Sequence, residues 1–253
     1  MKLNNKTILI TGASSGIGAE LAIQLAAKGN RLVLLARRCE LLLELVQQLA
    51  PHAHEHLYFH CDVSDPDQVK DICDWITKSE VTIDVLILNA GFNGGFSVKE
   101  IDLDLFRQHV EVNFFGAVYF IKYLVPEMIR RKSGLIAVNG SLAGYRGMPK
   151  AAAYSAAKGA LMNFIDSIRI DLYKYNIHCT LISPGFVKTP ITDRVEFYMP
   201  FMMSVDKATH IIVRGLERAQ TEIRFPWPMV CAAQVGRLLP NRFYAWLMQS
   251  SRR

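Results

Sequence analysis

A glycine-rich segment near the N terminus, TGASSGIG at Thr11–Gly18, stands between an apolar run and a helical pattern. Gly12 permits a tight turn, Gly16 lets the backbone approach a pyrophosphate, and Gly18 lets the helix pack close to the strand. The helix N terminus supplies free N–H groups and a partial positive charge. Glycines also serve ordinary tight turns, but the position directly after an N-terminal strand favours a phosphate site. The candidate cofactor-binding residues of this loop are Gly12, Ser14, Ser15, Gly16, Ile17 and Gly18.

Beyond this loop, apolar runs alternate with helical patterns along the chain, which indicates βαβ units and a parallel sheet. The runs are continuously apolar, as in ILI and VLIL, which suits a sheet covered by helices on both faces. We therefore predict one α/β domain over residues 1–253, a Rossmann-like doubly wound parallel sheet of about seven strands. Strands are expected at 7–11, 32–36, 57–61, 83–88, 134–139, 177–182 and 222–225, with long helices at 103–131 and 151–175.

Composition and charge exclude several other classes. The start of the chain has no signal-peptide pattern, and no charge-free apolar stretch reaches the ~18 residues of a spanning helix, so a cytoplasmic location is expected. The five cysteines form no C-x-x-C pair. The histidines between His52 and His60 could suggest a metal, but a solvated loop explains them better and no metal site is predicted. The net charge of +6 comes without a recognisable nucleic-acid module, so no nucleic acid partner is expected.

The end of the second strand indicates which dinucleotide the loop would hold. An NAD site usually places an acidic residue there, about 20 residues beyond the glycines, to bind the ribose 2′-OH. Here the sequence reads Leu34-Leu-Ala-Arg-Arg38, with no carboxylate before Glu40. Guanidinium groups suit a 2′-phosphate, so Arg37 and Arg38 favour NADP(H). For Arg38, a solvated residue at a helix start is an equally good explanation.

A second group of residues suggests proton transfer. Tyr154 and Lys158 are four residues apart in a helical pattern, so both side chains lie on one face. A phenol titrates near ~10, and a neighbouring ammonium or an oxidised nicotinamide would favour its phenolate. Tyr154 could then exchange a proton with a substrate oxygen, which Ser141 could also hydrogen-bond. A Y-x-x-x-K pair alone is common on helix surfaces; Ser141, 13 positions earlier, makes the catalytic interpretation stronger.

Together these motifs resemble the short-chain dehydrogenase/reductase superfamily, over residues 7 to about 190 and in the family's order. The resemblance implies that Asp62 and Val63 hold the adenine, that Asn89, Ala90 and Gly91 line the cofactor, and that hydride leaves from the pro-S face. It also implies that Asn113 holds a water relaying protons through Lys158; the alternative is a polar residue that kinks a buried helix. By the same resemblance, the segment with Pro184, Gly185, Val187 and Thr189 lies beside the nicotinamide carboxamide.

The substrate and the partners are less defined by the sequence. Phe197–Val205 is rich in aromatic residues and methionine, and with Phe92–Phe96 it suggests a hydrophobic, lipid-like substrate. Packing on the protein's own core or on another subunit would explain the same residues. The resemblance places dimer contacts on the two long helices, so a homodimer or homotetramer is expected.

The C-terminal stretch 227–253 is an apolar and basic extension of the same domain. Its pattern predicts two short amphipathic helices at 229–239 and 241–249. From Arg224 to Arg253 the chain has five arginines and no acidic residue. The extension could pack on the protein, form a subunit contact or lie on a membrane surface.

The main expectation is NADP(H)-dependent interconversion of a ketone and a secondary alcohol, with Asn113, Ser141, Tyr154 and Lys158 as the catalytic set. A non-catalytic NADP(H)-binding sensor or scaffold on the same fold is the alternative. A membrane-surface protein whose extension does the main work is a third possibility.

Overall fold

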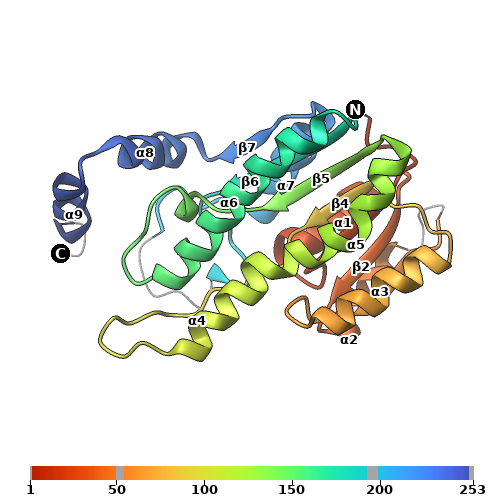
Figure 1. Cartoon of the computed structure of the whole chain (residues 1–253), viewed down its shortest axis with the longest axis horizontal. Helices are drawn as coiled ribbons and strands as arrows, with labels where there is room; N and C mark the ends of the chain where they lie inside the picture. Colours follow the sequence, from red (N-terminus) through yellow and green to blue (C-terminus); the bar gives the residue numbers. More distant parts are fainter. Residues whose placement is uncertain (1, 50–53, 193–198, 251–253) are drawn as a thin grey trace.

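The computed structural model describes residues 2–49, 54–192 and 199–250. Seven strands form one sheet in the order β3-β2-β1-β4-β5-β6-β7, and every neighbouring pair is parallel (Figure 1). The predicted fold class is therefore confirmed. The strands are β1 (Thr7–Thr11), β2 (Arg31–Ala36), β3 (Leu57–His60), β4 (Val85–Leu88), β5 (Gly134–Asn139), β6 (Ile177–Pro184) and β7 (Glu222–Phe225).

Helices cover both faces of the sheet because successive strand residues point to opposite sides. In β1, Ile8 and Ile10 join one buried cluster and Leu9 joins the other. The first cluster lies under α1 (Gly16–Ala26), α2 (Cys39–Leu49) and α7 (Val205–Glu217). The second lies under α3 (Pro66–Lys78), α5 (Gly116–Arg131) and α6 (Ala152–Tyr173). The strand side chains are buried on both faces, which explains why the strand sequences are continuous apolar runs.

The helix predicted over 103–131 consists of three consecutive pieces. A π-helical turn at Glu111–Phe115 separates α4 (Leu103–Val110) from α5. By length and composition the whole segment could cross a membrane. However, Phe120, Leu124 and Met128 are buried in the core under the sheet, as expected for a core helix of an α/β domain.

Local sequence signals account for the helix starts. The Asp65 carboxylate accepts hydrogen bonds from the backbone N–H groups of Asp67 and Gln68, at 3.0 and 3.2 Å. Pro66 occupies the first helical position, where its missing N–H is not needed. These two features explain why α3 begins at Pro66.

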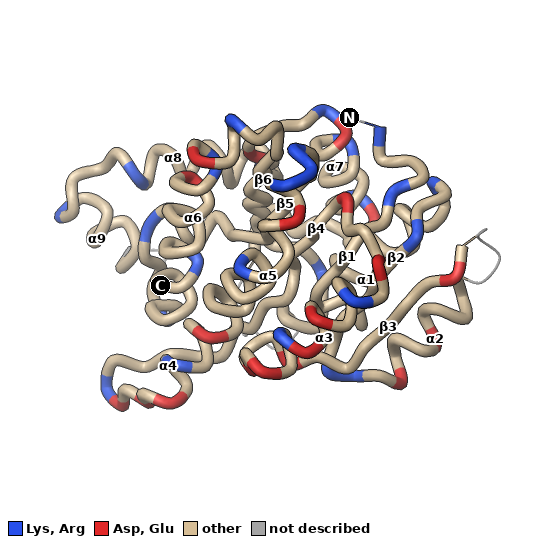
Figure 2. Tube along the Cα trace, turned by 45° about the vertical axis from the view of Figure 1, so that its right-hand side comes forward, with Lys and Arg blue, Asp and Glu red and all other residues tan. Residues whose placement is uncertain are grey.

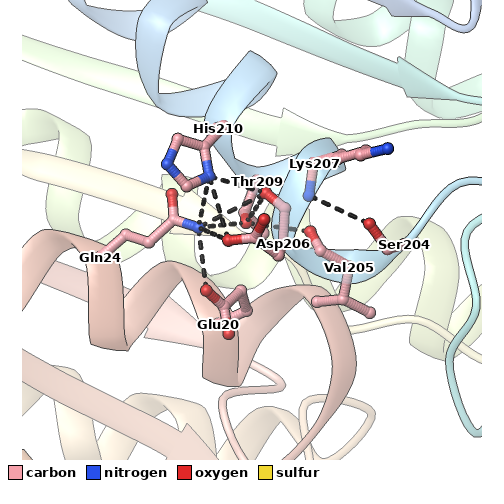
Figure 3. Close-up of polar contacts among 8 residues, drawn as sticks. All are labelled: Glu20, Gln24, Ser204, Val205, Asp206, Lys207, Thr209 and His210. Carbon is pink, nitrogen blue, oxygen red and sulfur yellow. Dashed lines mark hydrogen bonds and ion pairs between the residues drawn. The ribbon is translucent and has the colours of Figure 1, made fainter.

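Polar contacts hold α7 against α1 (Figure 3). The Gln24 amide nitrogen of α1 lies 2.7 Å from Thr209 Oγ1 and 3.1 Å from His210 Nδ1, both on α7, and 2.9 Å from Glu20 Oε1 of its own helix. Near the other end of α7, Lys28 Nζ lies 2.9 Å from a Glu217 carboxylate oxygen. These contacts fix α1, whose N terminus carries the glycine loop.

Two helices extend the chain beyond β7, as the sequence predicted. They are α8 (Trp227–Leu238) and α9 (Asn241–Ser250). In Figure 1 they reach outward from the β7 side of the molecule. α8 contacts β7 and the short 3-10 helix Leu142–Gly144.

Candidate active site

A cleft lies at the carboxyl ends of the strands, where the strand order reverses between β1 and β4. Open α/β sheets bind ligands at this point. Most of the predicted site residues meet here, although their sequence positions span 177 residues from Gly12 to Thr189. The predicted residues that line the cleft are Gly12, Ser14, Ser15, Gly16, Ile17, Arg37, Arg38, Asp62, Val63, Asn89, Ala90, Gly91, Tyr154, Lys158 and Thr189.

The glycines of the loop leave no space for side chains. A Cβ on Gly12 would lie 2.8 Å from Ala90 Cα, and one on Gly18 would lie 2.3 Å from the Gly12 carbonyl oxygen. Gly12 and Gly16 also adopt φ angles of +65° and +57°, which L side chains rarely adopt. Gly18 therefore acts by close packing between helix and strand, as predicted, and is absent from the cleft lining.

The N terminus of α1 is open to an anion. Ser15 is the N-cap residue, and among the described side chains none caps the first turn. The Arg38 guanidinium instead donates hydrogen bonds to the hydroxyls of Ser14 and Ser15, at 3.0 and 2.7 Å. The free backbone N–H groups, the helix dipole and the guanidinium together fit a dinucleotide phosphate.

Arg37 points toward the third strand instead. Its guanidinium lies 3.6 Å from the Asp62 carboxylate, whose Oδ1 accepts hydrogen bonds from the Ser64 backbone and hydroxyl. Burial raises the pKa of Asp62, but the Ser64 hydrogen bonds and the Arg37 charge outweigh burial and hold the pKa below its ordinary value. Asp62 is therefore an ionised acceptor at neutral pH.

A hydrogen-bonded bridge connects the strand ends below the cleft. The Asn89 amide nitrogen donates to the carbonyl oxygens of Thr11 and Gly12, and its Oδ1 accepts from the Asn139 amide at 3.0 Å. The Thr11 hydroxyl accepts from the backbone N–H groups of Asn89 and Ala90. This bridge holds the glycine loop in register with the strand ends of β4 and β5.

Tyr154 and Lys158 lie on one face of α6, as their spacing predicts, with the Lys158 nitrogen 5.8 Å from the Tyr154 ring centre. Lys158 is buried and donates a 2.7 Å hydrogen bond to the Asn139 carbonyl oxygen. Ser141, directly after β5, hydrogen-bonds the Tyr154 hydroxyl and also accepts from the Ala143 N–H at 3.1 Å. Three of the four predicted catalytic residues are thus neighbours: Tyr154 and Lys158 line the cleft, and Ser141 contacts Tyr154 without being part of the cleft lining.

The ionisation of the pair is set by burial. Burial raises the pKa of Tyr154, and the hydrogen bond from Ser141 offsets part of that rise. Burial also lowers the pKa of Lys158 to about 7. Loss of hydration disfavours both charged forms, so in the protein by itself these two pKa shifts oppose a phenolate beside an ammonium. The role expected of Lys158 with a bound nicotinamide stays a prediction.

Asn113 lies in the π-helical turn, and its side chain holds the loop after Gly91. Its amide donates to the carbonyl oxygens of Phe92 and His109, at 2.8 and 3.0 Å, and its Oδ1 accepts from the Phe92 N–H. A Cβ on Gly91 would lie 3.4 Å from Asn113 Oδ1 and 3.8 Å from Lys158 Nζ. Asn113 is therefore close to the lysine, and the water relay stays a prediction.

His109 holds the same loop. The sequence did not indicate this role. It is fully buried, its Nδ1 lies 2.8 Å from the Leu105 carbonyl oxygen, and its Nε2 accepts from the Gly94 N–H. The Phe92 ring packs on the imidazole at 4.8 Å. A histidine inside a helical pattern gives no sequence signal for such a role, because the partner loop is 15 residues away.

Three further predicted residues, at the end of β6 and just after it, are absent from the cleft lining. Val187 is buried in the core, Pro184 ends β6, and the Gly185 N–H donates to the Phe225 carbonyl oxygen at 2.7 Å. Their contact with a cofactor stays a prediction. Of the predicted substrate segment 197–205, residues 197 and 198 lie outside the described part of the chain. Phe201 and Met202 are exposed, whereas Met203 pairs with Val187.

The structure adds cleft residues that the sequence did not indicate. Gln108 and Val112 come from the α4 and π-helical segment, and Pro190 and Ile191 follow Thr189. Because Thr189 was predicted to lie at the site, its two neighbours in sequence could have been predicted with it. The position of Gln108 could not be predicted from the sequence, because a polar residue on a helix is usually solvated.

Metal chemistry receives no support from residues 2–49, 54–192 and 199–250, where no group of three His, Cys, Asp or Glu side chains could hold an ion. His52 of the histidine-rich segment lies outside the described residues. The five cysteines are free, and burial raises the pKa of Cys61 and Cys73 to about 12.

Comparisons with known proteins agree with this geometry. A family model described as short chain dehydrogenase matches residues 6–197. An uncharacterized oxidoreductase of Myxococcus xanthus (strain DK1622) is 32% identical over 243 residues, covering 96% of each chain. The family resemblance stated from the motifs is therefore confirmed.

Solved structures share the fold. An alcohol dehydrogenase from the archaeon Thermococcus sibiricus, complexed with 5-hydroxy-NADP, has a TM-score of 0.79 and 25% identity, covering 87% of this chain and 95% of that one. A short-chain dehydrogenase/reductase from Burkholderia phymatum, in complex with NAD, has a TM-score of 0.84 and 22% identity, covering 92% and 93%.

Proposed function

The chain belongs to the short-chain dehydrogenase/reductase family, and on that premise we propose that it reduces the ketone of a hydrophobic, lipid-like substrate with NADPH. The observation that carries this proposal is the pair Tyr154 and Lys158 in the lining of the cleft, with Ser141 hydrogen-bonded to Tyr154. Fold alone would not suffice, because one fold can hold many functions.

The cofactor preference rests on the arginines at the end of β2. Arg38 crosses to Ser14 and Ser15 of the glycine loop, so its guanidinium stands beside the anion-binding helix end. Arg37 lines the same cleft. A 2′-phosphate would gain charge-assisted hydrogen bonds from these groups, which a 2′-hydroxyl cannot match. Solved structures of similar fold hold either cofactor, 5-hydroxy-NADP in the Thermococcus sibiricus dehydrogenase and NAD in the Burkholderia phymatum protein, so the proposal of NADPH rests on the arginines.

The proton chemistry follows from the protonation states. A raised pKa keeps Tyr154 a neutral phenol at physiological pH, ready to donate its proton to a carbonyl oxygen. Ser141 would hydrogen-bond the same oxygen and orient it. Lys158, with a pKa of about 7, can then return a proton to the Tyr154 oxygen. Bound NADPH supplies the hydride.

Apolar residues of the cleft lining suggest the hydrophobic substrate. Phe92, Val112 and Ile191 line the same cleft as Tyr154 and Lys158. Phe201 and Met202 add exposed apolar surface in the segment after it. Apolar walls with a few convergent polar groups are typical of sites for small hydrophobic ligands.

The decisive experiment compares NADPH and NADH consumption by the purified protein over a panel from small ketones to long-chain 3-keto lipids. Tyr154→Phe should abolish turnover, whereas Tyr173→Phe, on an exposed position of the same helix, should retain it. Full turnover by Tyr154→Phe would refute the mechanism. Tight NADPH binding without turnover on any compound would favour the non-catalytic sensor.

We also propose a homo-oligomer that associates through α5 and α6. Ile170 and Tyr173 of α6 are largely exposed, and Phe115 stacks with Tyr119 at the start of α5. Light scattering should give at least a dimer, and Tyr173→Glu should lower the mass. A monomeric mass for the wild-type protein would refute the proposed homo-oligomer.

A further inference from the structure

The C-terminal helices α8 and α9 each present an apolar stripe to solvent, and we propose that this paired surface docks on an anionic lipid bilayer. The proposal stands on the surface of the extension and does not depend on the reaction. Exposed apolar patches rimmed by polar residues mark sites of interaction with proteins or membranes.

The stripe on α8 consists of Trp227, Cys231, Val235 and Leu238, spaced by four, four and three residues, so the side chains share one helix face. All four are exposed, with Trp227 at 77% and Leu238 at 85%. The opposite side of α8 packs on the protein. Gly236 is buried there.

The stripe on α9 consists of Phe243, Trp246 and Leu247, again at the i, i+3, i+4 spacing of one face. Their exposed fractions are 61%, 62% and 43%. The Phe243 and Trp246 rings contact each other at 5.8 Å and form one continuous aromatic surface. An exposed tryptophan beside phenylalanine and leucine is the composition of helices that lie in a membrane interface.

The extension is fixed on the body by a set of contacts on its inner side. The Arg146 guanidinium donates to the carbonyl oxygens of Gly236 and Leu239 at the end of α8, and stacks 4.0 Å above the Tyr244 ring of α9. The Tyr244 hydroxyl donates to the Gly147 carbonyl oxygen at 2.8 Å. The inner faces of both helices are thus occupied, and the outer stripes keep a defined orientation.

Charge decides which partner fits. No acidic residue follows Glu222, whereas Arg237 lies on α8 and Arg242 on α9 (Figure 2). A second copy of the same surface would bring these arginines against like charges. Anionic headgroups would pair with the arginines while the aromatic side chains enter the acyl boundary.

The test is flotation of the full-length protein with vesicles of phosphatidylglycerol and phosphatidylcholine, against vesicles of phosphatidylcholine alone. The wild-type protein should float with the anionic vesicles and less with the neutral ones. Replacing Arg237 and Arg242 by Gln should lower partitioning about 30-fold, since each charge near the surface counts for about one kcal/mol. Leu238→Glu should lower it about tenfold or more.

The matched control is Val98→Glu, which adds the same charge at an apolar side chain that is 78% exposed elsewhere on the molecule. It should float like the wild-type protein. In a Trp75→Phe background, brominated lipids should also quench the fluorescence of Trp227 and Trp246. Circular dichroism would verify that each variant is folded.

Three outcomes would overturn the proposal. One is a wild-type protein that stays in the soluble fraction with anionic vesicles. Another is equal loss of flotation by Val98→Glu and Leu238→Glu. The third is a Leu238→Glu variant that changes the oligomeric mass in light scattering while vesicle binding stays the same, because a second copy would then occupy the stripes.

Discussion

Replacing the buried Lys158 should stabilise the protein at neutral pH while it removes the proposed activity. Lys158 is only 2% exposed, and burial lowers its pKa from 10.5 to about 7. The ammonium form of Lys158 is therefore less stable in the folded protein than in the unfolded chain, where it is hydrated. Lys158→Met keeps a similar shape without the charge, so it tests whether the site holds a destabilising charge in the absence of cofactor.

The magnitude follows from linkage. Between the two pKa values the unfolded chain binds more protons than the folded one, so stability of the wild-type protein rises with pH over this window. At about 1.4 kcal/mol per pH unit, the full cost at or below pH 7 comes to about 5 kcal/mol. In Lys158→Met, loss of the hydrogen bond to the Asn139 carbonyl oxygen lowers the free energy of unfolding by about 1–3 kcal/mol. The net gain of Lys158→Met at pH 6–7 should then be about 2–4 kcal/mol.

The assay is urea unfolding of the cofactor-free wild-type and Lys158→Met proteins at pH 6, 7, 8 and 9. The difference between the two should shrink by about 2 kcal/mol from pH 7 to pH 9, because the folded wild-type lysine is then neutral. The subtraction cancels titration of the cysteines, which both proteins share. Lys99→Met, at an exposed lysine, should show no such trend. A Lys158→Met difference that stays constant from pH 6 to pH 9 would refute the argument.

Three further variants test other parts of the site and fold. Arg38→Ala should raise the KM for NADPH about tenfold or more while the KM for NADH stays within twofold; equal changes for both cofactors would contradict the 2′-phosphate assignment. Gly18→Ala places a Cβ 2.3 Å from the Gly12 carbonyl oxygen, so it should cost about 1–3 kcal/mol in thermal unfolding, and an unchanged Tm would be inconsistent with this packing. Asp65→Ala removes the N-cap of α3 and should lower the urea-derived stability by about 1 kcal/mol; no change would mean that water replaces the carboxylate.

The cofactor side of the cleft was predictable because it depends on local rules. Buried parallel strands appear as continuous apolar runs, and their carboxyl ends must meet at one edge of the sheet. Glycines directly after the first strand mark the phosphate turn, and Tyr154 and Lys158 share a face by helical spacing alone. None of these inferences needs a contact between distant segments.

Strand ends and protonation states were harder to predict because they depend on long-range contacts. β6 continues to Pro184, two residues beyond the expected end, since Ser183 and Pro184 pair with Arg224 and Phe225 of β7. The pKa directions of Tyr154 and Lys158 follow from burial in the cleft. The burial of a side chain depends on the folded chain and cannot be predicted from the residues next to it in the sequence.

The contact between the β5–α6 connection and the C-terminal extension shows the same limit most clearly. The connection from β5 to α6 carries Ser141 and, five residues later, Arg146, which holds the end of α8 about 90 residues further along the chain. From the sequence, an arginine in a loop is expected to be a solvated charge. Only the position of α8 reveals that Arg146 binds helix carbonyl groups. Helix spacing encodes local backbone geometry, whereas a side-chain contact between a loop and a terminal extension depends on how distant segments pack. Sequence reasoning can therefore bring the residues of the glycine loop and of the Tyr154–Lys158 pair to one cleft, but the contact between Arg146 and the end of α8 is visible only in the folded structure.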